Sequence, residues 1–370
     1  MKYQGQFPIF NLSAVKTYPL STRDNKVNLE DYVNLDHLKR SPYHRCKEPW
    51  FRNGKKGAGE DQSIGLEELA NYTVKCFREK KPIIVLSGAH FIKNGQSPIC
   101  LELIRRGIIT LIGTNGAGTI HSLELALTGA SSESVRDALP KGEFGMAFET
   151  GAYLNNAIKL AHSKGFGYGE AMGRLYGDAS FRKAVIDETF ASHRDDTRYL
   201  KPYDGFPHAD DNVFAVAWRK GVPTCVFGMI GTDIIDQHDT FDGEAKGAVS
   251  GADFLIFTEE ISKCTNGGVI LNIGTAVMGP EVVLKAVSMA ANVGRKPDGL
   301  WTGDFDIRPF VFDDDVRDEN HYYYYMRDQK SIATRIPKVF GGNGFYFQGM
   351  HEDTLVPFYQ HILKALGEKE

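Results

Sequence analysis

The chain has 370 residues, of which 42% are hydrophobic and 24% are charged, and its formal net charge at pH 7 is -4. This length permits one large α/β domain or two smaller ones, each with a sizeable buried core. The mildly acidic balance, with no basic block, argues against nucleic acid as a partner. No apolar run is long enough to span a membrane, so we expect no membrane partner.

The cysteines and the first residues of the chain indicate a compartment. Five cysteines are scattered along the sequence, and none forms a CxxC pair. This usage is typical of reduced thiols rather than of disulfides or zinc ligands. The opening MKYQGQFPIF lacks the apolar core of a signal peptide. We therefore expect a cytoplasmic protein.

The first part of the chain is predicted to be an extension that precedes one α/β domain. Residues 1–60 are polar and mixed, and residues 61–370 form the predicted domain, which begins with a helix over Leu66–Lys80. Two apolar runs follow, Ile83–Leu86 and Ile108–Ile112. Each ends in a loop of small residues and leads into helical spacing. Two successive strand–loop–helix units are typical of a doubly wound parallel sheet.

The same periodicities continue along the chain. They predict helices over Ser132–Leu139, Val213–Arg219, Glu281–Asn292 and Leu355–Leu366, and strands over Pro223–Phe227, Phe254–Phe257, Gly268–Ile273 and Phe345–Phe347. The predicted fold is therefore an α/β fold, a Rossmann-like, doubly wound and mostly parallel sheet.

Several predicted strands end in loops of small or hydroxyl residues. These loops are Ser87-Gly88-Ala89, Thr114 to Gly118, Gly228 to Asp236 and Gly274-Thr275-Ala276. Parallel strands bring such loops to one edge of the sheet, where backbone N–H groups can approach phosphates at helix N-termini. The sequence therefore predicts a nucleotide or cofactor groove. Since no loop reads GxGxxG, tight turns without a ligand stay an alternative.

Two pairs of polar residues follow these loops and are candidates for chemistry. His121 and Glu124 stand three apart at a helix start, so they share a face and could form a general acid/base pair. Local capping of the first turn would also explain them. Asp233 and Asp236 are likewise three apart and could bind ribose hydroxyls and a substrate amine. The alternative is one capping and one solvated aspartate.

The histidines and aspartates of two loops were weighed as metal ligands. His208, Asp210 and Asp211 crowd one loop, and His238, Asp239 and Asp242 lie in another. Their spacing matches no strong ligand motif, so we predict no metal site.

Four segments in order resemble the deoxyhypusine synthase family. They are PIIVLSGAHFIKNGQSPICLELIRRGIITLIGTNGAG, AWRKGVPTCVFGMIGTDIID, KCTNGGVILNIGTAV and HEDTLVPFYQHIL. The resemblance runs from about Pro82 to the C-terminus, with a poorly matching insert near 140–205. It implies an NAD cofactor, a small-molecule amine or polyamine substrate and an imine-forming lysine. It also implies a homo-oligomer, specifically a tetramer.

The resemblance also assigns roles to individual residues. It implies that NAD is bound by Ser87, Gly88, Thr114, Asn115, Gly116, Gly118, Asp233, Gly274, Thr275 and Ala276. On the polyamine side, Ile120-His121 replaces the family's acidic pair. Lys338 stands near the expected place of the family's lysine but lacks the Trp-Gly before it.

These departures predict an NAD-dependent aminoalkyl transferase-like enzyme that is not a true deoxyhypusine synthase. The residues assigned to chemistry are Lys338, His121, Glu124 and Asp236. Two alternatives stay open: a non-catalytic NAD-binding homologue, and another NAD-using reaction such as deacylation of a lysine.

Overall fold

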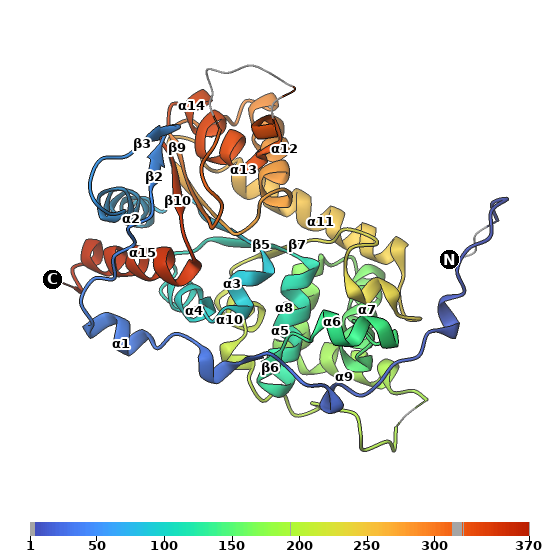
Figure 1. Ribbon diagram of the computed structural model, residues 1–370. Helices are drawn as coiled ribbons and strands as arrows, with labels where there is room; N and C mark the ends of the chain where they lie inside the picture. The colour runs from blue at the N-terminus through green and yellow to red at the C-terminus, as the bar shows by residue number, and fades with distance from the viewer. Residues whose placement is uncertain (1–3, 193, 313–319, 321, 370) are drawn as a thin grey trace. The chain divides into compact units, whose positions relative to one another are not determined.

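The computed structural model describes the whole chain except residues 1–3, 193, 313–319, 321 and 370 (Figure 1). Its internal contacts divide it into two compact units. Unit 1 comprises residues 1–31 and 115–254, and unit 2 comprises 32–114 and 255–370. No boundary between these units falls near residue 60, because residues 32–114 all belong to unit 2. The division into an extension over 1–60 and a domain over 61–370 stays a prediction.

Unit 2 is built on a mostly parallel sheet. Its strands are β2 (Trp50–Arg52), β3 (Lys55–Lys56), β4 (Ile83–Ser87), β5 (Leu111–Asn115), β8 (Gly268–Ile273), β9 (Leu300–Asp306) and β10 (Gly344–Gln348). They follow the order β3-β2-β10-β9-β8-β4-β5. The pairs from β10 to β5 are parallel, and β2 and β3 are antiparallel additions at one end.

Helices cover both faces of this sheet. The helices of unit 2 are α1 (Leu35–Arg40), α2 (Ser63–Arg78), α3 (Ala89–Lys93), α4 (Ser97–Arg105), α12 (Met278–Asn292), α13 (Arg327–Lys330), α14 (Ile336–Val339) and α15 (His351–Leu366), with a π-helical turn, η8, at Ser331–Arg335.

The alternation of side chains along β9 shows which helices cover each face of the sheet. The ring of Phe305 lies 5.3 Å from that of Phe358 on α15. On the opposite face, the hydroxyl of Thr302 donates to the carbonyl of Ile332 on η8 at 2.6 Å. Thus α2 and α15, which pack side by side, cover one face, and α12, α13 and η8 lie over the other. The predicted doubly wound, Rossmann-like α/β fold is confirmed.

Unit 1 is largely helical. It holds α5 (Gly116–Thr128), α6 (Val135–Ala138), α7 (Phe148–Lys164), α8 (Tyr168–Gly177), α9 (Ala179–Thr189), α10 (Val213–Lys220), β7 (Thr224–Phe227) and the antiparallel pair β1 (Val27–Asn28) and β6 (Ala130–Ser131). Helix α11 (Gly243–Ile261) runs from unit 1 into unit 2. Short 3-10 turns occur at Leu12–Ala14, Leu20–Thr22, Leu29–Asp31, Leu139–Lys141, Ala209–Asp211, Ile234–Gln237 and Tyr322–Tyr325.

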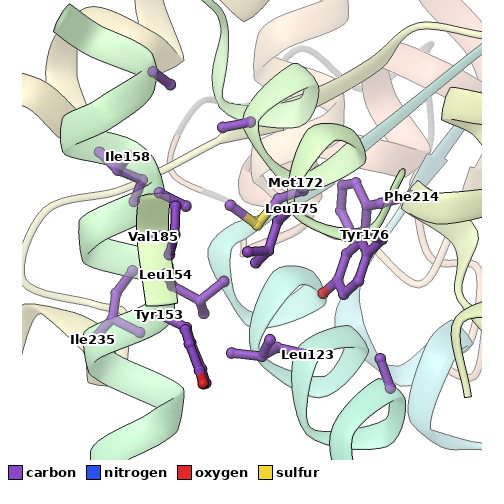
Figure 2. Close-up of a cluster of buried hydrophobic side chains, with 14 of the residues drawn as sticks. Leu123, Tyr153, Leu154, Ile158, Met172, Leu175, Tyr176, Val185, Phe214 and Ile235 are labelled. Atoms are coloured by element: carbon purple, nitrogen blue, oxygen red, sulfur yellow. The ribbon is translucent and has the colours of Figure 1, made fainter. Parts of the chain in front are cut away.

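The core of unit 1 lies where α5, α7, α8, α9 and α10 meet. Figure 2 shows Leu123 of α5, Leu154 of α7 and Leu175 of α8 pointing toward one another. Because each of these leucines is at most 1% exposed, the cluster is a closed hydrophobic core that holds α5 against α7 and α8.

Two sequence-based assignments need correction. The predicted strand over Phe254–Phe257 is wrong, because these residues lie within α11, a helix of 19 residues. A short apolar run alone does not distinguish a strand from a buried stretch of helix. The strand β9 was not predicted, because two aspartates and a glycine interrupt its apolar residues.

Candidate functional site

The carboxyl ends of four parallel strands in unit 2 form one continuous edge. Backbone bonds join the loops that follow them: Gly88 N donates to Ile273 O at 2.9 Å, Gly274 N to Phe305 O at 2.9 Å, and Gly349 N to Asp306 O at 3.0 Å. The edge is therefore a single platform made by the ends of β4, β8, β9 and β10, the position at which ligands bind in such sheets.

Close packing of the loops explains the predicted glycines of unit 2. A Cβ on Gly88 would lie 2.3 Å from the carbonyl oxygen of Gly274. Gly274 itself has φ +59, and a Cβ there would lie 2.8 Å from the ring of His351. These glycines let the loops of β4 and β8 approach each other.

The hydroxyls of the same loops are engaged with the backbone. Thr114 donates to the carbonyl of Ser87 at 3.0 Å, and Thr275 accepts from Gly279 N at 3.0 Å. Ala276, the last of the predicted residues in unit 2, is half-buried beside Thr275. The structure thus brings the unit 2 members of the predicted cofactor set to one edge.

Three aspartates and one arginine gather beside this edge; with Asn272 they are called the aspartate cluster. Asp304 and Asp306 lie on the same face of β9, and Asp328 comes from α13. Arg308 donates to Asp306 at 2.9 and 3.1 Å and also to Asp328. Asn272 on β8 donates to Asp304 at 2.8 Å. Fully ionised, the cluster would carry more negative than positive charge.

Several polar atoms of the aspartate cluster have no partner. Asp304 Oδ2, Asp328 Oδ1 and Asn272 Oδ1 are buried and form no hydrogen bond among the described residues. Burial and then the charge of Asp328 raise the pKa of Asp304 well above its usual range. Burial likewise raises the pKa of Asp328 to about 6, against the opposing charge of Arg308. Perturbed carboxyl groups of this kind are frequent at functional sites.

A histidine completes the edge. His351 is the first residue of α15, its ring abuts Gly274, and its buried Nδ1 has no hydrogen-bond partner among the described residues. Burial lowers its pKa to about 4, against the charge of Asp306 and with a smaller contribution from His90. The imidazole is therefore neutral at physiological pH.

In unit 1, the predicted cofactor residues surround the first turn of α5. The side chain of Asn115 accepts from Gly118 N at 3.1 Å and caps the helix. A Cβ on Gly116 would lie 2.0 Å from Asp233 Oδ2, so this carboxylate fills the space beside the helix start. Asp233 and Asp236 both bind the buried Lys246, at 2.8 and 2.6 Å.

His121 and Glu124 share a face of α5, as predicted, but Glu124 is fully engaged. Its two oxygens accept from Arg23 at 2.9 and 2.6 Å, from Ser131 at 2.7 Å and from Thr150 at 2.9 Å. These four residues are called the arginine cluster. Burial alone would raise the pKa of Glu124, but Arg23 outweighs it and lowers the pKa. His121 Nδ1 lies 2.6 Å from the hydroxyl of Ser131.

Lys338 lies away from the loop edge of unit 2. It is exposed on the short helix α14, which precedes β10. Two residues later, the carbonyl of Phe340 accepts from Gly299 N at 2.6 Å, just before β9 begins. This places α14 at the amino ends of the strands, opposite the edge of His351 and Gly274. The catalytic roles assigned to Lys338, His121, Glu124 and Asp236 stay predictions.

Sequence reasoning missed the aspartate cluster and His351. The signal was present in Leu300–Asp306, LWTGDFD, where two aspartates two apart fall on one face of a strand. Recognising this signal would have required assigning a strand whose buried face carries charged residues. Asp328 and Asn272 carry no local signal of this kind.

The described part of the chain lacks two features. It contains no group of three or more His, Cys, Asp and Glu residues that could hold a metal ion. No helix in these same residues is long and apolar enough to cross a membrane.

Comparisons with known proteins identify no family. No protein-family model and no curated protein matches the chain. Similar solved structures include the arginine dihydrolase ArgZ from the ornithine–ammonia cycle in Cyanobacteria (13% identity, TM-score 0.41, 82% of this chain and 32% of that one). They also include AgrE in a ternary complex with ornithine and NAD+ (14%, 0.44, 82% and 33%) and a LOR/SDH protein from Methanococcus maripaludis S2 (14%, 0.41, 84% and 71%). The chain spans about a third of the length of ArgZ and AgrE.

The resemblance to deoxyhypusine synthase is therefore wrong as a family assignment. No family model matches, and the similar structures reported above are ArgZ, AgrE and a LOR/SDH protein. The physical reason lies in the segments that carried it. PIIVLSGAH and KCTNGGVILNIGTAV contain β4 and β8, two adjacent parallel strands with closely packed loops. Any doubly wound sheet with such loops calls for apolar runs followed by small residues.

Proposed function

We propose that this protein is an NAD-dependent enzyme that acts on a small amine. The observation that carries the proposal is the aspartate cluster, which places buried carboxyl groups with unpaired oxygens beside the carboxyl ends of parallel strands. A cationic amine would supply the positive charge and the N–H donors that this cluster lacks.

The predicted loops fit a dinucleotide at the level of the backbone. In unit 1, we propose the first turn of the 13-residue helix α5 as a phosphate contact, and the carboxylate of Asp233, which lies beside Gly116, as a contact of ribose hydroxyls. In unit 2, Ser87, Gly88 and the segment Gly274–Ala276 present small residues at the strand ends. Each set of residues is proposed as cofactor contacts within its own unit. NAD would supply the acceptor for a hydride from the carbon next to the amine nitrogen.

The protein's own residues would bind and orient the amine. Asp304 and Asp328 would hold the ammonium group in a buried place where charge-assisted hydrogen bonds are strong. Loss of a hydride from carbon and of a proton from nitrogen converts the amine to an imine. Transfer of the resulting group to an acceptor lysine, through Lys338 or another lysine, is the finer hypothesis; borohydride trapping followed by peptide mapping tests it.

The test separates cofactor binding from amine chemistry. Calorimetry with NAD+ and NADH should show binding, and NADH should form when primary amines are added to protein and NAD+. Asp304→Asn should leave NAD+ affinity unchanged and raise KM for the amine about 10- to 100-fold, the effect of one charged hydrogen bond.

The matched control is Asp253→Asn. Asp253 is also a buried aspartate, but it lies in unit 1 and holds backbone N–H groups of Gly169 and Val226. It should leave KM unchanged. Absence of NAD binding removes the proposal, and NAD binding without any amine-dependent NADH favours the non-catalytic homologue. A homo-oligomer stays a prediction, which light scattering after size exclusion checks.

A further inference from the structure

We propose that the aspartate cluster binds a primary ammonium group and that this binding expels a proton held by its carboxyl groups. The inference rests on the proposed function and deepens it, because it names the chemical class of the amine and a measurable consequence of its binding.

The proposed binding of a primary ammonium follows from the hydrogen-bond donors and acceptors of the cluster. Arg308 donates to Asp306, to Asp328 and to the sulfur of Met326. Asn272 spends its N–H donors on Asp304 and on the carbonyl of Thr275. With Asp304 ionised, three buried oxygens able to accept have no partner among the described residues: Asp304 Oδ2, Asp328 Oδ1 and Asn272 Oδ1.

A primary ammonium has three N–H donors and one positive charge, so its donors equal these three acceptors in number. Each N-methyl group replaces one donor by an apolar group and leaves one oxygen unpaired in a buried place. Asp304 and Asp328 are 0% exposed, so bulk water does not take over the lost bond. The cluster should therefore rank amines by their number of N–H donors.

The proposed release of a proton follows from the burial of two neighbouring carboxyl groups. Asp304 on β9 and Asp328 on α13 are both 0% exposed; the charge of Asp328 raises the pKa of Asp304, and the charge of Asp306 raises the pKa of Asp328. Asp304 accepts one hydrogen bond, from Asn272, so its burial beside a second carboxyl group favours the protonated form over the carboxylate.

Among the described residues, the other charged groups around the cluster are engaged elsewhere. Arg308 is committed to Asp306 and Asp328. From β10, the phenol of Tyr346 donates to the carbonyl of Arg308 at 2.7 Å. Beside them on α13, Arg327 pairs with Glu281 of α12 at 3.3 Å, and Lys330 donates to the carbonyl of Tyr324 at 2.8 Å.

The exchange is balanced. A protonated Asp304 carboxyl and a free alkylammonium become an Asp304 carboxylate paired with the bound alkylammonium, and one proton passes to the buffer. No bond to carbon forms or breaks. Amine affinity should therefore rise with pH while Asp304 is protonated in the free protein.

Isothermal titration calorimetry of the full chain, saturated with NAD+, tests both halves. The probes are butylamine, N-methylbutylamine and N,N-dimethylbutylamine, each titrated at pH 6 and 7 in two buffers with different ionisation enthalpies. We expect release of about one proton per butylamine bound. We also expect affinity to fall about 10-fold or more for each N-methyl group.

Variants assign the proton. Asp304→Asn preserves the side-chain volume but carries no exchangeable carboxyl proton, so proton release should vanish and butylamine should bind more weakly. Asp328→Asn repeats the test from the other carboxyl group. Asp253→Asn, a buried aspartate of unit 1, should leave both the proton count and the affinity of butylamine as they are.

The outcomes separate this inference from the proposed function. Equal affinity for the three amines, or binding with no proton released, overturns the inference; NADH formation from an amine would still support the function. If none of the three amines binds and none yields NADH, both are overturned.

Discussion

The arginine cluster of unit 1 and the aspartate cluster of unit 2 both bury carboxyl groups around one guanidinium, and they treat them in opposite ways. Glu124 uses both oxygens, with donors from Arg23, Ser131 and Thr150. Asp304 and Asp328 each keep one oxygen without a partner among the described residues.

This difference separates a carboxylate whose oxygens the protein satisfies from carboxyl groups that keep an open acceptor. An unpaired buried polar atom costs free energy, so a fold that only needs rigidity satisfies its carboxylates. The arginine cluster does so, and the same pattern recurs where Asp233 and Asp236 flank Lys246. The aspartate cluster keeps oxygens that lack hydrogen-bond donors among the described residues, and a ligand can supply those donors. The predictions below test this contrast, starting from the largest effect.

Removing the cation of the arginine cluster should give the largest loss of stability. In Arg23→Ala, Glu124 stays buried with no compensating charge, and breaking such a pair costs about 3 to 5 kcal/mol. Urea denaturation should show this loss as a lower free energy of unfolding of the variant. Arg23→Met combined with Glu124→Gln should recover most of it, because the unpaired charge is gone. A loss below about 1 kcal/mol would mean that the pair is not structural.

A buried aspartate outside both clusters sharpens the contrast. Asp253 Oδ2 accepts from Val226 N at 2.6 Å and Gly169 N at 2.8 Å, while its other oxygen has no partner. Burial raises the pKa of Asp253 to about 7. The folded protein thus binds the proton more tightly than the unfolded chain, so stability is lost as pH rises from about 4 through 7.

Asp253→Asn should remove that loss, because an amide oxygen can still accept both N–H bonds and does not ionise. At pH 8 we expect a higher unfolding free energy by no more than about 4 kcal/mol, the equivalent of about three pKa units. Below pH 4 the variant and the parent should converge. A pH-independent difference between them would show that geometry, not ionisation, sets the effect.

The aspartate cluster should respond to the same change with little or no loss of stability. Asp304→Asn removes a carboxyl group that burial disfavours and adds N–H donors near unpaired oxygens. We expect the unfolding free energy at pH 8 to rise by about 1 kcal/mol. Thermal denaturation at pH 5 and 8 checks this, since the gain should shrink at pH 5. A loss of several kcal/mol would place Asp304 with the structural carboxylates.

Much of the fold follows from the sequence because periodicity is a local signal. The strands β4 and β8 and the helices α2, α10, α12 and α15 are present close to their predicted positions. The apolar runs of the two strands are continuous because both faces of the sheet are covered. The strand at Leu111–Asn115 begins three residues later than predicted, since an apolar run does not mark where pairing starts.

The candidate site was harder to predict because its members meet only in the folded chain. Asn272, Asp304 and Asp328 come from separate elements, and β9 reads poorly as a strand. Glycines after strands were interpreted as signs of a ligand, but packing within the protein also explains them. A Cβ on Gly88 would clash with the carbonyl of Gly274, and a Cβ on Gly116 would clash with the carboxylate of Asp233. A small residue after a strand therefore reports a close approach, without saying whether a ligand or the protein makes it.

The smallest effect is expected at Lys338, and it tests whether chemistry lies on the loop edge of unit 2 or elsewhere. An imine-forming lysine must be partly deprotonated at neutral pH, which requires burial or a nearby cation. Lys338 is exposed on α14, at the amino ends of the strands. Lys338→Ala should change the unfolding free energy by less than about 0.5 kcal/mol, as for most surface substitutions. Amine-dependent NADH formation should also stay as it is, because the aspartate cluster and the strand-end loops are untouched. If this variant instead abolishes NADH formation or a borohydride-trapped adduct, the chemistry includes Lys338, and the contrast between the two clusters no longer locates the site.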